Sequence, residues 1–571
     1  MQMKKNNQSI PLSLCGAFFA ATLISQIAVA ADAGGIQRDI ENLNNPKLSP
    51  PVPPKEQETT EPNGNNNVAV TVTTFKITGA TYFSDAELQA HVANYIGKTL
   101  DLSALNQVTK SISQFYQANG WLAKVYLPPQ DIQDGVVTIA ITEAQLGEVH
   151  LDSSLAHRMD TSFAVKMLTD AQKSGKPLST KALERSMLLI NDTPGFSGQA
   201  TLSQGKKSGE TDVTLNLADK PLVNGRVWAD NYGSRALGKG RLNGQASFND
   251  ITGFGDQLLF FGLLSRGLGY LQGGYDFPTS YSGTRMNVRA AITNYDVNGA
   301  GLDNLDANGQ SHFYRLSISH PFLRSRFTNF IFRSSLASLH SVDKVLGLEV
   351  ANKSYGALTM DFTADHSDNL GLGGTLWAGA SITAGDLDLS GNQDDLVIDR
   401  ASARIDGRYH KLNLHIGRSQ ILSDRFTAKA LFSAQFSDSN LSGFEKFSLG
   451  GPAGVAGFTV GETAADQGGM FNLEGKYFIN QNWSASLLGD AGRVCLYKHT
   501  WVGWNANNPN LKNCYAIASV GFGVAYKVKN IDARLSFSQR IIGNRGADNK
   551  GHDVEGESRK HQLWLQVGFS F

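Results

Sequence analysis

The sequence has no excess of charge of either sign and few cysteines. Lysine plus arginine and aspartate plus glutamate each number 51, and the 571 residues include three cysteines. Without a basic surplus, the composition gives no indication that nucleic acid is a partner. Beyond Ala30 the sequence also lacks any apolar run of about 18 residues, so no transmembrane helix is expected.

Catalytic and metal-binding motifs are also missing. The chain has no HExxH, no GxSxG and no Walker loop, and its histidines are scattered. The segment Asp386 to Gly391 begins like a calcium loop, but Val397 stands where the closing glutamate belongs. We therefore expect no enzyme activity, no cofactor and no metal site, and we interpret that segment as an acidic loop.

The N-terminus has the features of an export signal. Lys4 and Lys5 precede an apolar stretch that ends in the small residues Ala28-Val29-Ala30, a pattern that signal peptidase accepts. Residues 1–30 are therefore predicted to be a signal peptide. Cys495 and Cys514 remain in the mature chain, and in an oxidising compartment a disulfide between them is favoured over two free thiols.

A short helix and a linker follow the signal peptide. Ile36, Ile40 and Leu43 have the spacing of one helix face, which predicts a helix within residues 31–45. Residues 46–69 are rich in proline and asparagine and form a linker. From the residues alone, a disordered tail explains this region equally well.

The next region contains the same small module twice. Each copy has the order strand, helix, helix, strand, strand, and the predicted boundaries are residues 70–146 and 147–218. In the first copy, Ser84 and Glu87 have the spacing of a capping box at the start of a helix. Each copy is long enough to be a small domain.

Residues 221–571 alternate between apolar and polar side chains over many short segments. A soluble sandwich alternates in this way too. The export signal, the small polar second face and the terminal aromatic residue Phe571 favour an outer-membrane barrel. The length of this region predicts about 16 antiparallel strands.

The order of these parts resembles that of the two-partner secretion transporters (TpsB) of the ShlB/FhaC/HecB haemolysin activation/secretion type, within the superfamily of outer-membrane POTRA barrels. The segment at residues 230–258, "HPFLRSR" at His320 to Arg326 and "LGDAG" at Leu488 to Gly492 are similar to motifs of this family. The resemblance covers essentially the whole mature chain. It implies a β-rich membrane protein with an N-terminal plug helix, two small α+β POTRA domains and a 16-stranded antiparallel transmembrane β-barrel.

A glycine-rich stretch, "FSLGGPAGVAGFTVGE", resembles the family's sixth extracellular loop, which folds back into the barrel lumen. Glycines allow such a backbone to turn tightly inside a crowded pore. The tetrad at the loop tip of the family corresponds here to Val455, Ala456, Gly457 and Phe458. Ala456 stands where the family has an arginine.

In the family that arginine contacts an aspartate of the barrel wall, which Asp490 matches here, with Gly492 in the same motif. Strand alternation places Asp490 on the lumenal face, where an unpaired charge is costly. We expect Arg418 and Arg534 on the lumenal face as well, and Arg493 lies close in sequence. The hypothesis is that one of these three arginines pairs with Asp490.

The resemblance implies a translocator in the outer membrane of a Gram-negative bacterium, with its POTRA domains in the periplasm. It would recognise a partner exoprotein of the haemolysin, adhesin or contact-dependent inhibition toxin type and export it to the cell surface. We expect capture either by strand addition to an exposed sheet edge or in a groove between a strand and a helix. The candidate edges are "AKVYL", "VVTIAIT" and "GQATLSQ".

Further expectations concern the surroundings of the barrel. We expect a monomer that contacts outer-membrane lipid and is inserted by the barrel assembly machinery. An assembly factor for other outer-membrane proteins is the alternative function, and a solute porin is a weaker one. The sequence does not identify the exported partner.

Overall fold

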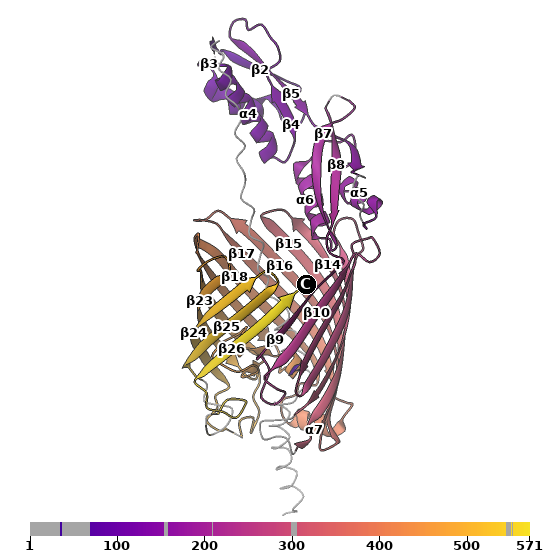
Figure 1. Cartoon of the computed structure of the whole chain (residues 1–571), viewed down its shortest axis with the longest axis vertical. Helices are drawn as coiled ribbons and strands as arrows, with labels where there is room; N and C mark the ends of the chain where they lie inside the picture. The colour runs from indigo at the N-terminus through magenta and orange to yellow at the C-terminus, as the bar shows by residue number, and fades with distance from the viewer. Residues whose placement is uncertain are drawn as a thin grey trace, which may run out of the picture.

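The computed structural model describes residues 33, 35, 36, 69–152, 158–207, 209–297, 305–506, 508–543, 550 and 552–571. Two small modules lie at one end of a closed barrel, and helix α7 (Gln393–Ala401) lies at the opposite end (Figure 1). The predicted signal peptide, almost all of the predicted linker, and Ile40 and Leu43 of the predicted plug helix fall outside the described residues. No helix in the described part of the chain is long and apolar enough to cross a membrane.

The first module is a three-stranded sheet with two main helices. The strand order is β2-β5-β4, with β2 parallel and β4 antiparallel to β5. The predicted capping box is present, because the Ser84 hydroxyl accepts a hydrogen bond from Glu87 N and the Glu87 carboxylate accepts one from Ser84 N. The elements are β1 (Ala69–Thr71), β2 (Thr74–Thr78), α3 (Asp85–Val92), the 3-10 helix η1 (Ala93–Tyr95), β3 (Thr99–Asp101), α4 (Leu102–Ala118), β4 (Ala123–Tyr126) and β5 (Val136–Glu143).

One expectation for this module is wrong. The sequence predicts an exposed sheet edge at "VVTIAIT", but this stretch lies in β5, the central strand of the sheet. Both sides of β5 are occupied by neighbouring strands, and its alternate side chains Val137, Ile139 and Ile141 are buried in the core of the module. The edges of this sheet are β2 and β4, so "AKVYL" keeps its predicted edge position.

The second module repeats this arrangement with the strand order β6-β8-β7. Apolar residues of both helices fill its core, among them Phe163 of α5 and Ile190 of α6. Strand β7 lies at an edge and includes the predicted "GQATLSQ" segment. The elements are β6 (Gln145–Leu151), α5 (Thr161–Thr169), α6 (Thr180–Asp192), β7 (Phe196–Gln204) and β8 (Glu210–Asp219).

The barrel confirms the predicted fold. Within the described residues, 16 antiparallel strands close on one another, with β26 paired to β9. The strands are β9 (Val223–Asp230), β10 (Arg241–Asn249), β11 (Gln257–Ser265), β12 (Leu268–Pro278), β13 (Arg285–Asp296), β14 (Asn308–Arg324), β15 (Thr328–Val345), β16 (Leu348–Asp368), β17 (Gly374–Asp388), β18 (Gly407–Ser423), β19 (Phe426–Ser437), β22 (Gln467–Phe478), β23 (Trp483–Cys495), β24 (Cys514–Val528), β25 (Ile531–Ile542) and β26 (His561–Ser570).

Alternation along the strands separates a lipid-facing surface from a lumenal surface. Leu264, Leu316, Leu336 and Leu563 are among the large apolar residues exposed on the outside of the barrel. Neighbours of opposite parity are buried inside, such as Ser335 beside Leu336. An apolar outer face and a polar interior are the expected arrangement for a barrel in lipid.

Part of the N-terminal segment lies among lumenal side chains. Ala33 is fully buried within an apolar cluster of the barrel interior, and Ile36 packs against the same cluster. The amide of Ala33 also donates to Asp343 Oδ1 at 3.3 Å. These residues belong to the segment in which the sequence predicts a plug helix.

Candidate functional site: the inner loop and its contacts with the barrel

The long connection between β19 and β22, residues 438–466, is called the inner loop here. It is fixed at its base by two buried ion pairs. Glu445 pairs with Lys411 of β18 and also accepts a hydrogen bond from the Tyr355 hydroxyl of β16. Asp466 pairs with Lys446 at 2.6 Å and is fully buried. Short strands β20 (Phe447–Ser448) and β21 (Ala464–Ala465) then bring the two arms of the loop together.

Glycines allow the loop to fold back on itself. A Cβ on Gly454 would lie 1.9 Å from Leu449 O, and a Cβ on Gly450 would lie 2.0 Å from Thr459 O. Gly451 has φ +97°, a conformation that other residues rarely adopt. The lack of side chains at these positions therefore explains the glycine-rich composition of the stretch.

The tip of the loop contacts Asp490 on the lumenal face of β23. Asp490 Oδ2 accepts hydrogen bonds from Ala456 N at 3.2 Å and from the Ser519 hydroxyl at 3.4 Å. Its Oδ1 accepts a third from Asn472 Nδ2 at 2.7 Å. Asp490 is 9 % exposed, so these donors replace the water that a carboxylate would otherwise bind.

Four wall residues line up beneath the tip. The strand register pairs Asn472 with Asp490, Asp490 with Ser519, and Ser519 with Arg540, which places them in one row across β22 to β25. The Asn472 amide also donates to Gly454 O at 2.8 Å, and Gly457 N donates to the Ser519 hydroxyl at 3.0 Å. The wall therefore binds the loop backbone as well as Asp490.

Arg540 supplies a guanidinium from the wall to the loop. Its Nε donates to Gly457 O at 2.8 Å, and its guanidinium carbon lies 4.4 Å from the ring centre of Phe458. Trp564 Nε1 of β26 donates to Ala456 O at 2.7 Å. Phe458 is fully buried, and the guanidinium over its ring adds a cation–π contact.

The glycine of the aspartate motif has a packing role. A Cβ on Gly492 would lie 2.8 Å from both terminal carbons of Leu449. Leu449, Val455 and Phe458 of the loop share an apolar cluster with Val494 and Ile517 of the wall. The small residue therefore makes room for the loop against β23.

The three predicted arginine partners lie elsewhere. Arg418 lies two residues from the exposed Ile416 on the same face of β18. It therefore faces outward, whereas the sequence analysis expects it in the lumen. Its ion pair is with Asp368. Arg534 is lumenal, but its ion pair is with Glu474 at 3.8 Å. Arg493 is exposed and lies on the outer face of β23, opposite to the face of Asp490. Within the described residues, Asp490 accepts hydrogen bonds from Asn472, Ser519 and a backbone amide. Sequence reasoning missed these donors because strand register cannot be derived from a single segment.

The seam of the barrel is the contact between β26 and β9, and it is short. Its register runs over five residue pairs, from Gln566 with Asp230 to Ser570 with Arg226. Phe571 extends the pairing, because its amide and carbonyl exchange hydrogen bonds with Gly225 at 2.9 Å. A Cβ on Gly225 would lie 2.5 Å from the ring of Phe571, so the terminal aromatic residue packs on bare backbone.

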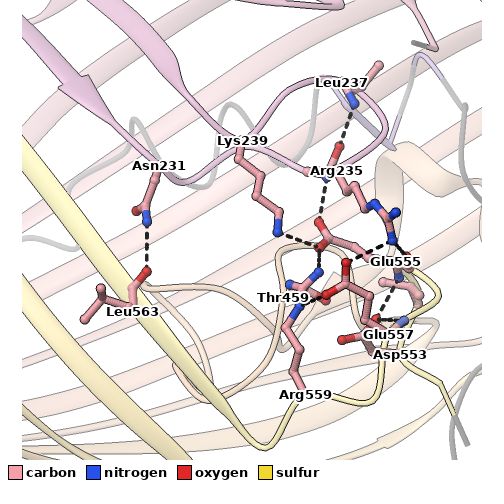
Figure 2. A network of polar contacts seen from close by, with 12 residues as sticks. Asn231, Arg235, Leu237, Lys239, Thr459, Asp553, Glu555, Glu557, Arg559 and Leu563 are labelled. Atoms are coloured by element: carbon pink, nitrogen blue, oxygen red, sulfur yellow. Dashed lines mark hydrogen bonds and ion pairs between the residues drawn. The ribbon is translucent and has the colours of Figure 1, made fainter. Parts of the chain in front are cut away.

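Asn231 continues the seam beyond the last paired residues. Its side chain donates to Leu563 O at 2.8 Å and accepts from Leu565 N at 2.9 Å, and its backbone N donates to Leu565 O at 3.2 Å. Figure 2 shows the Asn231 side chain directed at Leu563. The side-chain amide of Asn231 thus makes the hydrogen bonds to β26 that the backbone of a paired strand residue would make.

A network of ions, called the seam network, joins the first and last extracellular loops next to the seam (Figure 2). Arg235 lies 2.9 Å from Glu557, and its backbone N donates to Glu555 at 2.7 Å. Arg559 pairs with both glutamates, and Lys239 lies 4.0 Å from Glu555. The Arg559 hydrogen bond holds the pKa of Glu557 below its usual value.

The disulfide candidates are joined in the structure. Cys495 ends β23, Cys514 begins β24, and the two form a disulfide. They are also register partners across the two strands. The bond closes the base of the connecting loop.

Together, these features describe an outer-membrane barrel that carries small periplasmic modules and holds one of its own loops in its lumen. The family model for haemolysin secretion/activation protein ShlB/FhaC/HecB matches residues 209–504, and the model for the ShlB-type POTRA domain matches residues 70–144. The chain belongs to this family of two-partner secretion transporters.

Similar proteins agree with this assignment. A heme/hemopexin transporter protein, HuxB, of Haemophilus influenzae is 28% identical over 84% of this chain and 83% of its own length. The outer membrane transporter CdiB of Escherichia coli is 23% identical over 78% of this chain and 75% of its own length. The solved structure of CdiB from Escherichia coli covers 96% of this chain and 98% of that chain, with a TM-score of 0.66 at 20% identity.

The chain is therefore an outer-membrane transporter that exports a partner exoprotein, and its POTRA domains lie in the periplasm. The relatives named here are transporters and not enzymes.

Proposed function

We propose that the exoprotein passes through the barrel lumen and that the inner loop, bound to Asp490, forms part of the wall of this export path. The two modules deliver the extended exoprotein to the lumen. The row of Asn472, Asp490, Ser519 and Arg540 carries this proposal, because it binds the loop tip through side chains from four neighbouring strands. The loop then forms a fixed part of the lumen wall. Ala33 and Ile36, which lie in the lumen, belong to the segment that must leave to widen the path.

The exoprotein is captured at free sheet edges. Strands β4 and β7 are edges of their sheets, and Tyr126 and Leu202 on them are exposed. An extended chain adds to such an edge through backbone hydrogen bonds. Because β4 and β7 are edge strands and β5 is central, we propose β4 and β7, and not β5, as the strands that bind the exoprotein.

The family resemblance supports a partner of the haemolysin, adhesin or contact-dependent inhibition toxin type. The similarity to heme/hemopexin transporter proteins supports a partner that handles haem or hemopexin. The protein has no enzyme activity of its own in this proposal, acts as a monomer in outer-membrane lipid, and is inserted by the barrel assembly machinery.

Depletion of the protein distinguishes export from the alternatives. Loss of one surface protein, with other barrels unchanged, is the result expected for a dedicated exporter. Loss of many barrels would instead indicate an assembly factor. A change restricted to small-solute permeability would indicate a porin.

A further inference from the structure

The motif at His320 to Arg326 lies where the barrel meets the second module. It spans the end of β14 and the turn to β15, and α6 of the second module packs against this end of the barrel. Figure 1 shows α6 directly above the barrel rim. Three residues of the motif, Pro321, Arg324 and Arg326, contact this helix.

Arg324 holds the C-terminal end of α6. Its Nε donates to Asp192 Oδ2 at 2.7 Å and its Nη2 to Asp192 Oδ1 at 2.8 Å, a bidentate pair. Its Nη1 is bound to Ser325 O and Asn329 Oδ1, both at 3.0 Å. The barrel side thus fixes the guanidinium in place for Asp192, and such a fork sets direction as well as distance.

Two further polar contacts run along the helix. Arg326 lies 3.5 Å from Glu184, and its backbone N donates to the same carboxylate at 3.2 Å. Arg185 donates in the reverse direction, to Pro321 O at 2.6 Å and to Ser282 O at 3.3 Å. The barrel and α6 therefore each donate and each accept hydrogen bonds at this contact.

Apolar contacts complete the joint. Leu189 of α6 packs so closely on Gly283 that a Cβ there would lie 2.6 Å from Leu189 Cδ2. Phe163 of α5 stacks edge-on with Phe254, with ring centres 6.0 Å apart. The module thus rests on the turns between β10 and β11, β12 and β13, and β14 and β15.

The other end of α6 is attached to the first module. Thr180 N, at the start of the helix, donates to Gly120 O at 3.0 Å. Leu178 N donates to Ala144 O at 2.8 Å, and Ala144 N donates to Leu122 O at 2.9 Å. Backbone hydrogen bonds thus connect the two modules at the point where α6 begins.

We infer that α6 holds both modules in a fixed orientation relative to the barrel entrance, and we call this helix the strut. The motif from His320 to Arg326 is the site on the barrel to which the strut is attached. Arg324 and Asp192 are positioning residues, because they orient the modules and do not contact the exoprotein. This inference rests on the proposed delivery of the exoprotein by the modules. Export then depends on a constant orientation of the modules and not on their swinging.

Charge reversal tests the strut in the full-length chain. Arg324→Glu and Asp192→Arg, made singly, each place like charges together and are expected to reduce export of the partner exoprotein by roughly tenfold, as loss of a bidentate charged pair implies. The double variant restores opposite charges and is expected to restore export. Arg425→Glu, an exposed arginine at another periplasmic turn, is the matched control and leaves export unchanged.

A covalent link separates orientation from charge. Asp192→Cys with Arg324→Cys loses the ion pair, and a short bis-maleimide linker between the two thiols is expected to restore export. Cys495 and Cys514 do not compete for the reagent, because they are joined in a disulfide. Heat-modifiable migration in gels confirms that each barrel is folded and inserted.

The outcomes are distinct. Recovery in either the swapped or the linked variant supports the strut. Normal export by Arg324→Glu, or no recovery in both the swapped and the linked variants, overturns it. If the unmodified protein does not export the exoprotein at all, the proposed function fails and not merely the strut.

Discussion

The contact of the inner-loop tip with the barrel wall and the seam between β26 and β9 belong to the same barrel, yet they are built differently. The tip is buried and held on Asp490 by an amide side chain, a hydroxyl and a backbone amide. The seam has a short register and is supported by Asn231 and the seam network, part of which is exposed.

This difference indicates which of the two contacts is weakened by changes in salt concentration and pH. Hydrogen bonds in a buried site are little screened, and leaving one of their donors unpaired is costly. Ion pairs at the surface are weakened by salt and contribute little individually. The tip is therefore expected to stay fixed over conditions that loosen the extracellular end of the seam.

The largest effect is expected at Asp490. Asp490→Ala removes the acceptor of three hydrogen bonds and leaves buried donors on Asn472 and Ser519 without that partner, which weakens loop docking by about 3 kcal/mol. Protease cleavage within the inner loop of intact cells, together with export, measures the change. Asp361→Ala, another lumenal aspartate, is the control and leaves the loop protected. Unchanged cleavage and export in Asp490→Ala would contradict the role of this site.

Arg540 is expected to have the next largest effect. Arg540→Met keeps the bulk of the side chain but loses the bond to Gly457 O, the contact with Phe458 and the ion pair with the buried Asp553, which weakens docking of the loop tip by about 2 kcal/mol. Protease cleavage within the inner loop of intact cells reports release of the tip. Arg534→Met, six residues away on the same lumenal face of β25, should show no extra cleavage. Equal cleavage in the two variants would mean that Arg540 does not hold the loop.

Asn231 should have a moderate effect that is confined to the seam. Asn231→Leu removes two side-chain hydrogen bonds to β26, which weakens the extracellular end of the seam by about 1 kcal/mol. Hydrogen exchange of the amides of β26, measured by mass spectrometry in detergent micelles, detects faster opening there. The amides of β23 serve as the internal reference, and faster exchange in both strands would show that the seam is not the weak contact.

The smallest effect is a pH and salt response of the seam network. The pKa of Glu557 is lowered by the hydrogen bond from Arg559. Its contribution is therefore present above the usual glutamate pKa and is lost as the pH falls through the lowered folded value. The protection of amides in residues 552–560, corrected for the intrinsic exchange rate at each pH, should fall at acidic pH and at high salt, while Arg235→Gln should remove part of this response. A response that is the same in Arg235→Gln and in the unmodified protein would exclude the seam network as its cause.

The sequence predicts features that depend on local pattern. Alternation along each segment gives the barrel strands and their lipid-facing residues, and the spacing of Ser84 and Glu87 gives a helix start. The position of Asp490 on the lumenal face follows from the same alternation. Each of these features is set by neighbours in the chain.

Features that depend on register or sheet order do not follow from the sequence. The edge expectation for β5 is wrong because the sheet order makes this strand central. The lumenal expectation for Arg418 is wrong for a different reason, because the alternation visible in the sequence already places it on the outer face with Ile416. The partners of Asp490 come from strands whose pairing is set by the closed barrel. The role of Arg324 likewise depends on a helix far away in the sequence.

Delivery of a partner exoprotein to the barrel by the periplasmic modules can be tested in cells. The chain is co-expressed with a large exoprotein encoded beside its gene, and that exoprotein is measured in the medium and on the cell surface. We expect export by the full chain and none after deletion of residues 74–219, with the barrel still folded. Export that is equal with and without the protein would contradict this expectation.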